Sequence, residues 1–160
     1  MNETERLQYR PCVGTMLVNA EGRVFVGKRI DNREGDWWQM PQGGVDDGED
    51  LDQAMLRELG EETGMRAAHL EIVSTLGHEL FYDLPDDLQG KLWGGRYKGQ
   101  RQTWYLVRFT GTESDIDLEA HAHPEFCEYK WIEPDLLPEL IVPFKKAIYE
   151  TVVAGFRELI

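Results

Sequence analysis

Long hydrophobic runs are missing from the sequence: no stretch approaches the ~20 apolar residues that a membrane-spanning helix needs. The opening residues, MNETERLQYR, lack the apolar core of a secretory signal. No repeat, low-complexity tract or long linker divides the 160 residues. We therefore expect one domain over residues 1–160, with enough residues to bury a core and without a membrane segment.

Cysteine is scarce as well. Cys12 and Cys127 stand alone in the sequence, without the spacing of a metal site. We expect both to pack as small apolar side chains in a reduced, cytoplasmic setting.

Positive charge is in short supply. The chain has 17 Lys and Arg against 30 Asp and Glu, a formal net charge of −13. General binding of nucleic acid is not expected, because affinity for the phosphate backbone comes largely from Lys and Arg. A phosphorylated substrate would need help from metal ions and a few well-placed basic residues.

What the sequence does have is an acidic stretch, GGVDDGEDLDQAMLRELGEETGM, from Gly43 to Met65. Its pattern predicts a helix over Leu51–Thr63, with acidic residues at the start and Gly64 as a left-handed C-terminal cap. At ~100° per residue, three glutamates project within roughly a third of a turn of one another. They are Glu58, Glu61 and Glu62.

The direction of this acidic face is informative. On the helical wheel it coincides with Leu51, Ala54 and Met55, whereas Gln53, Arg57 and Gly60 point the other way. Carboxylates that are partly removed from water repel each other unless a cation compensates. Hard divalent cations prefer oxygen ligands, and Mg²⁺ usually brings a phosphate substrate with it. The alternative is a solvated acidic surface, and the apolar residues on the same side argue against it.

The rest of the chain is predicted to form strands and a second helix. We expect strands at residues 12–18, 23–29, 70–80, 102–109 and 128–132, and a second helix over residues 143–160. The polar residues 31–36 form a loop. Residues 81–101 form a long loop that is rich in glycine, basic and aromatic residues, which suits stacking on a base and pairing with phosphate.

The acidic stretch resembles the Nudix box, G-x5-E-x7-R-E-U-x-E-E-x-G-U, where U is aliphatic, and it matches at every fixed position, with Met65 as the last U. Other segments resemble the RNA pyrophosphohydrolase and dinucleoside-polyphosphate hydrolase branch of the Nudix family. These segments are YRP at 9–11, WQMPQGG at 38–44, GQRQTWY at 99–105, PEF at 124–126 and FKK at 144–146.

The resemblance implies an α/β/α sandwich with a mixed central sheet and the motif as loop-helix-loop. It implies more than one Mg²⁺ or Mn²⁺ ion once substrate is bound. The implied metal ligands are Glu58, Glu61, Glu62, Glu125 and the carbonyl of Gly43, and one of these carboxylates would activate water. Arg57 and Glu49 would orient that shell, and Gly64 would end the helix. The implied substrate contacts are Arg10, Arg29, Tyr82, Arg101, Phe144 and Lys145.

The expected function is therefore metal-dependent hydrolysis of a nucleoside polyphosphate by attack of water at phosphorus. The substrate is an RNA 5′-triphosphate end, a dinucleoside polyphosphate such as diadenosine tetraphosphate, or both, and the oligomeric state stays open. A catalytically silent nucleotide sensor is one alternative, although it would be expected to have lost one of the motif glutamates. A structural Ca²⁺ domain is another, but the D-x-D-x-D-G loop pattern is absent.

Overall fold

The computed structural model describes residues 1–31 and 35–160. Part of the loop predicted over residues 31–36 therefore lies outside the described residues. The α-helices are α1 (Glu3–Arg6), α2 (Leu51–Thr63), α3 (Leu137–Leu140) and α4 (Lys146–Phe156). The strands are β1 (Tyr9–Val18), β2 (Val24–Arg29), β3 (Gln42–Gly44), β4 (Leu70–Thr75), β5 (Leu80–Asp83), β6 (Gly99–Phe109) and β7 (Phe126–Ile132).

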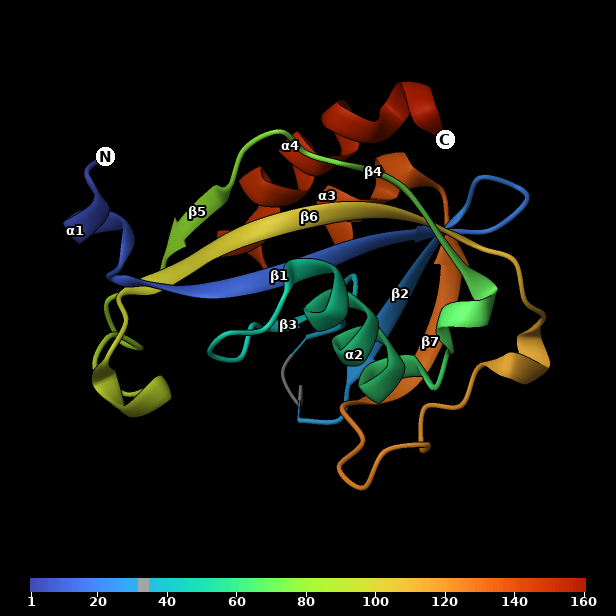
Figure 1. Cartoon of the computed structure of the whole chain (residues 1–160), viewed down its shortest axis with the longest axis horizontal. Coiled ribbons are helices and arrows are strands. Elements are labelled where there is room, and N and C mark those ends of the chain that lie inside the picture. Colours follow the sequence, from blue (N-terminus) through green and yellow to red (C-terminus); the bar gives the residue numbers. More distant parts are fainter. Residues whose placement is uncertain (32–34) are drawn as a thin grey trace.

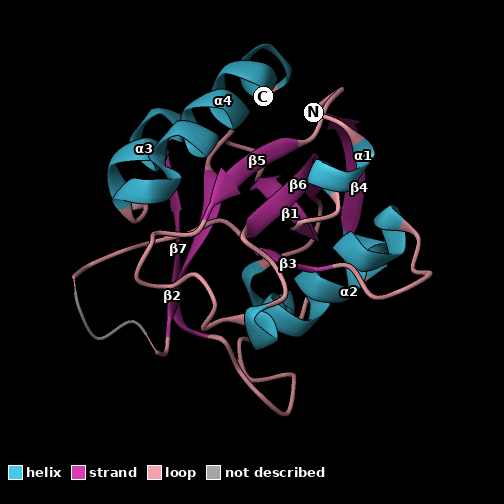
Figure 2. Ribbon diagram, turned by 90° about the vertical axis from the view of Figure 1, so that its left-hand side faces the viewer, coloured by secondary structure: helices cyan, strands magenta, loops and turns pink. Residues whose placement is uncertain are grey.

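The strands form one mixed sheet with the order β4-β6-β1-β2-β7. The central pair, β1 and β6, runs parallel, and the other pairs are antiparallel. Helix α2 covers one face, and α3 and α4 cover the other (Figures 1 and 2). The expected α/β/α sandwich is thereby confirmed.

Two apolar clusters hold these layers together. One lies between the sheet and α4, which contributes Ile148, Val152 and Phe156. The other lies between the sheet and α2, which contributes Met55 and Leu59. In the part of the chain that the structure describes, no helix is both long and apolar enough to cross a membrane.

The splaying of β1 from β2 shapes the molecule. These strands pair only at Val18 and Val24, beside the turn that joins them. Beyond that point the segment leading into α2 enters between them: Gln39 bridges to Gly27 of β2, and β3 pairs with β1. The gap in the sheet thus holds the segment that precedes the acidic helix.

Several predicted elements need correction. The expected strand over residues 70–80 ends at Thr75 as β4, and β5 begins at Leu80 and lies mostly in the predicted loop over residues 81–101. Both strands pair with β6, at different parts of it. Strand β3 and the short helices α1 and α3 were not predicted. The predicted helix over residues 143–160 is α-helical only in α4 and has a 3₁₀ turn at each end. Cys12 is buried as expected, whereas Cys127 is exposed, so the prediction of a buried Cys127 is wrong.

Helix α2 has the predicted bounds and the predicted C-terminal cap, and Asp50 is its N-cap. The Asp50 side chain accepts a hydrogen bond from the N–H of Gln53, and Gly64 adopts φ 74° at the C-terminal end. Ala54, Met55 and Leu59 are buried. Leu51 is 42% exposed, so its placement in the buried stripe was wrong.

One buried hydrogen bond joins α4 to the segment before the motif. The hydroxyl of Tyr149 accepts from the backbone N–H of Met40 at 2.8 Å, and both residues are buried. We expect Tyr149→Phe to lower the free energy of unfolding by about 1–3 kcal/mol, because it leaves that N–H without a partner. Urea denaturation measures the change, with the loop substitution Tyr97→Phe as the control. Equal stability of wild type and Tyr149→Phe would contradict this role.

Candidate active site

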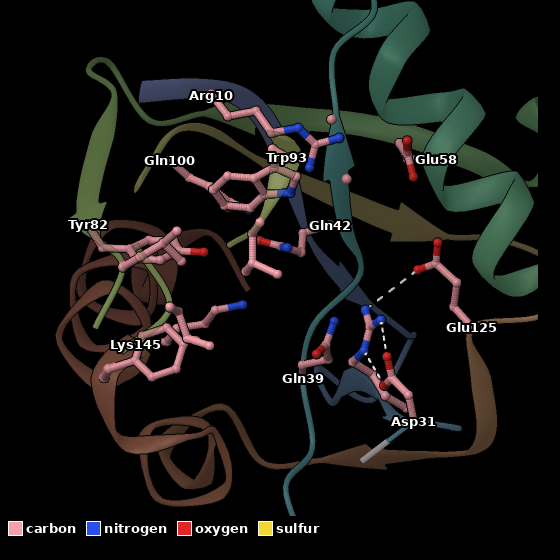
Figure 3. Close-up of a pocket in the computed structure, with 17 residues that line it drawn as sticks. Arg10, Asp31, Gln39, Gln42, Glu58, Tyr82, Trp93, Gln100, Glu125 and Lys145 are labelled. Atoms are coloured by element: carbon pink, nitrogen blue, oxygen red, sulfur yellow. Dashed lines mark hydrogen bonds and ion pairs between the residues drawn. The ribbon is translucent and has the colours of Figure 1, made fainter. Parts of the chain in front are cut away.

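A cavity of about 480 Å³ opens where β1 and β2 splay apart. It is lined by residues of β1, β2, β3, α2 and the C-terminal segment, together with the loop between β5 and β6. Figure 3 shows Glu58 and Glu125 on one side of this cavity and Tyr82 and Lys145 on the opposite side. The cavity therefore has an acidic wall that faces an aromatic and basic one.

The acidic wall begins with Glu58 of α2. Its side chain is 14% exposed and packs against the backbone of Gly43, where an added Cβ would lie 2.0 Å from Oε2 of Glu58. Glycine is required there because any side chain would collide with the carboxylate. Burial raises the pKa of Glu58 to about 7, although Arg57 opposes the shift.

Glu62, one turn further on, is completely buried. Neither of its carboxylate oxygens has a hydrogen-bond partner among the described residues. The N–H of Gln42 lies nearby but does not complete a hydrogen bond. Burial, together with the charges of Glu125 and Glu58, raises the pKa of Glu62 well above its usual value. A cation is the natural partner for such a group, so these residues fit a divalent metal ion.

Arg57 of α2 anchors the motif. Its side chain reaches the acidic face of the helix, so the prediction that Arg57 points the other way is wrong. Its Nε and Nη2 donate to the carboxylate of Glu49 at 2.7 and 2.8 Å, and Nη2 also donates to the carbonyl of Gly44 at 2.9 Å. Its Nη1 donates to Glu58 at 2.8 Å and lies 3.4 Å from Glu61. Hydrogen bonding to Arg57 lowers the pKa of Glu49 to about 2. The expected pairing of Arg57 with Glu49 is therefore present, and it ties the loop to the helix.

The second carboxylate on the cavity wall is Glu125, from the segment before β7. It lies 3.9 Å from the guanidinium of Arg29, which also makes two hydrogen bonds to Asp31 at 2.8 and 2.9 Å. Glu125 and Arg29 both line the cavity.

The carboxylates do not form a closed metal site. Among residues 1–31 and 35–160, no three His, Cys, Asp or Glu side chains converge as ligands for one ion. Neither Glu61 nor Glu62 lines the cavity: Glu61 lies beside Arg57, and Glu62 is buried behind the wall. Arg57 is bonded to Glu58 and lies 3.4 Å from Glu61, and Arg29 lies 3.9 Å from Glu125.

The opposite wall holds the expected substrate residues. The rings of Tyr82 and Phe144 lie 5.8 Å apart, and Nζ of Lys145 sits 5.6 Å from the centre of the Tyr82 ring. Phe144 is 41% exposed, so its ring is available for stacking. Burial and the nearby Arg29 lower the pKa of Lys145 to about 8. Arg10 completes the cavity from β1.

Arg101 is not brought to this cavity. In β6 it is paired with Pro11, and its side chain lies on the sheet face that carries α2, in a separate depression that Leu51 also lines. There its Nη1 donates to Glu79 at 3.0 Å. Its neighbour Gln100 lines the cavity instead. The expectation that Arg101 contacts substrate has no support from this placement.

Sequence reasoning also missed residues of the site. Trp104 donates to Gln102 at 2.8 Å, and the amide of Gln102 donates to both Gln42 and Gln100, which line the cavity. Asp31 and Gln39 line it too, as does Trp93 of the loop that was predicted to suit stacking on a base. The run of alternating polar residues that opens β6 was the available signal for Gln100 and Gln102, since alternate residues share a face.

The fold and this acidic helix define a hydrolase-type α/β/α domain, and comparison with known proteins identifies the family. Residues 8–152 match the NUDIX domain model, and the chain belongs to the Nudix family. It is 60% identical over 154 residues to an RNA pyrophosphohydrolase of Novosphingobium aromaticivorans, covering 96% of both chains. It is 56% identical over 156 residues to one of Erythrobacter litoralis, covering 98% of this chain and 95% of the relative.

Solved structures agree on the fold. The E. coli dihydroneopterin triphosphate pyrophosphohydrolase superposes with a TM-score of 0.70 at 20% identity, covering 91% of this chain and 97% of that one. A C. elegans Ap4A hydrolase superposes with a TM-score of 0.65 at 20% identity, covering 93% and 98%.

The isolation of Glu62 predicts an effect on stability. A carboxyl group whose pKa is raised by folding destabilises the protein as pH rises above its unfolded value, near 4.5. In metal-free buffer at pH 8 we expect Glu62→Gln to raise the free energy of unfolding by about 1–3 kcal/mol. Between pH 5 and 8 the free energy of unfolding of Glu62→Gln should also fall less than that of wild type. Urea denaturation in the presence of EDTA measures both effects, with the exposed Glu150→Gln as the control. The prediction would be refuted if Glu62→Gln were less stable than wild type at pH 8.

Proposed function

We propose that this chain is a metal-dependent pyrophosphohydrolase that acts on the 5′-triphosphate end of RNA. The observation that carries the proposal is the two-walled cavity, with carboxylates on one side and the Tyr82 and Phe144 rings with Lys145 on the other. Relatives that match nearly the whole chain at 50–60% identity are named RNA pyrophosphohydrolases, which supports this substrate over others. The Ap4A hydrolases share only the fold, so diadenosine tetraphosphate is the second candidate.

Each wall has a distinct task in this proposal. The rings of Tyr82 and Phe144 stack on the first base, and Lys145 with Arg29 meets the phosphates. The carboxylates Glu58, Glu61, Glu62 and Glu125, with the carbonyl of Gly43, would hold Mg²⁺ or Mn²⁺. When bound, such ions neutralise the nonbridging phosphate oxygens and lower the pKa of water.

The protein itself orients the reaction. Arg57 fixes the loop and Glu58 relative to each other through its bonds to Glu49, Gly44 and Glu58. One carboxylate of the acidic wall takes the proton from the attacking water, and the new bond from oxygen to phosphorus forms as the anhydride bond breaks. Pyrophosphate, or successive phosphates, leave from the RNA end.

The proposal is tested by turnover of a 5′-triphosphorylated oligoribonucleotide and of diadenosine tetraphosphate at equal enzyme concentration, with Mg²⁺, Mn²⁺ or EDTA. We expect the RNA to be the better substrate and EDTA to abolish both reactions. Binding of either substrate without turnover under all conditions would instead identify a nucleotide sensor.

Replacement of Glu62 tests the proposed metal ligands. We expect Glu62→Gln to lower kcat at saturating Mg²⁺ by at least ~10²-fold, the scale of losing one preorganised electrostatic group. The exposed Glu150→Gln is the matched control and should retain wild-type kcat. Near-wild-type turnover by Glu62→Gln would remove this residue from the reaction.

The arrangement also predicts which bond of diadenosine tetraphosphate breaks. In this proposal the Tyr82 and Phe144 rings hold one base at a fixed distance from the acidic wall. The phosphorus that is attacked is therefore set by its distance from that base and not by the middle of the symmetric chain, so the products should be ATP and AMP. Reaction in ¹⁸O-labelled water followed by mass spectrometry identifies the products and the labelled one. Two molecules of ADP as the main product would refute this selection.

A further inference from the structure

The loop between β5 and β6 carries a tryptophan in an unusual backbone conformation. Trp93 has φ 53°, and it is the one residue other than glycine with a positive φ among residues 1–31 and 35–160. Gly94 and Gly95 follow it with φ 69° and 73°. The left-handed region is unfavourable for a bulky residue, so the contacts of the side chain must hold Trp93 there.

Those contacts lead to Arg10. The guanidinium carbon of Arg10 lies 5.3 Å from the centre of the Trp93 ring, and Tyr97 packs edge-on against Trp93 with a centroid distance of 6.4 Å. On β3, a Cβ added to Gly44 would lie 2.4 Å from Nη2 of Arg10. The guanidinium therefore contacts both an aromatic ring and the bare backbone of the motif. Figure 3 shows Arg10 and Trp93 beside each other at one edge of the cavity.

The second observation concerns charge. Within the described chain, Arg10 has no carboxylate partner, although the sequence has 30 acidic residues. By contrast, Arg29 is bonded to Asp31, and Arg57 to Glu49. A guanidinium that stacks through its face keeps the N–H groups in its plane available, and those groups suit the oxygens of a phosphate.

We propose that Trp93 is a positioning residue, which holds the Arg10 guanidinium against Gly44 so that its unpaired N–H groups meet the phosphates of the substrate. This inference rests on the proposed function. Arg10 occupies one face of the Trp93 indole, so a base cannot stack on that face. Trp93 therefore acts through Arg10.

A double-mutant cycle on the triphosphorylated oligoribonucleotide tests this coupling. We expect Trp93→Ala to lower kcat/KM by roughly 3- to 30-fold, the range of a cation–π contact, mainly through KM. In an Arg10→Ala background the same replacement should change kcat/KM by less than about 2-fold, because the group that Trp93 positions is gone.

Three further variants separate positioning from simple packing. Trp93→Phe keeps an aromatic face and should restore most of the activity, whereas Trp93→Leu keeps apolar bulk only and should behave like Trp93→Ala. Arg96→Ala removes an exposed charge from the same loop and should leave kcat/KM unchanged. Circular dichroism and thermal melting establish that each variant is folded.

The outcomes are distinct. An equal loss on replacing Trp93 in the wild-type and Arg10→Ala backgrounds would overturn the inference and indicate direct contact of Trp93 with substrate. Full activity of Trp93→Leu would also overturn it. A wild-type protein that does not turn over the RNA would refute the proposed function, whatever the behaviour of the Trp93 variants.

Discussion

The site depends on one unfavourable placement, the burial of the Glu62 carboxylate without a partner. Every other carboxylate of the acidic helix face has an arginine beside it: Arg57 is bonded to Glu58 and lies close to Glu61. Glu62 is inaccessible to solvent and receives no hydrogen bond from the described residues. Such a group is tolerated because the rest of the domain supplies the stability, and it favours a cation at a point one helical turn from Glu58 of the cavity wall.

The sheet explains how that point meets a substrate. Because β1 and β2 pair only beside their turn, the segment from Gln39 to Gly44 enters between them and carries α2 to the edge of the gap. The same gap admits Arg10 from the start of the chain and Lys145 from near its end. The splayed strands thus bring three groups to one cavity: the acidic helix α2, Arg10 of β1, and the Tyr82 and Phe144 rings.

The local signals in the sequence were sufficient for the bounds of α2 and for its cap at Gly64, because these depend on neighbouring residues alone. They were not sufficient for its buried face, which excludes Leu51. The placement of Arg101 could not be obtained in this way. Successive residues of a strand face opposite sides of the sheet, so Gln100 lines the cavity whereas Arg101 faces α2, and the basic stretch around Arg101 does not reveal this. Strand β3 has only the residues Gln-Gly-Gly and no strand-like composition, and it forms because β1 offers it a partner. The contact of Trp93 with Arg10 joins segments that are distant in the sequence, so no local pattern predicts it.

The parallel pairing of β1 with β6 has a consequence for the timing of synthesis. Tyr9 pairs with Gly99, which is 90 residues further along the chain. At about 5–20 residues per second on the ribosome, the apolar β1 strand waits roughly 5–20 s for its partner. Arg10 must wait longer still for Phe144 and Lys145, which complete the opposite wall of the cavity near the end of the chain. The cavity is therefore complete only after residues 144 and 145 have been synthesised.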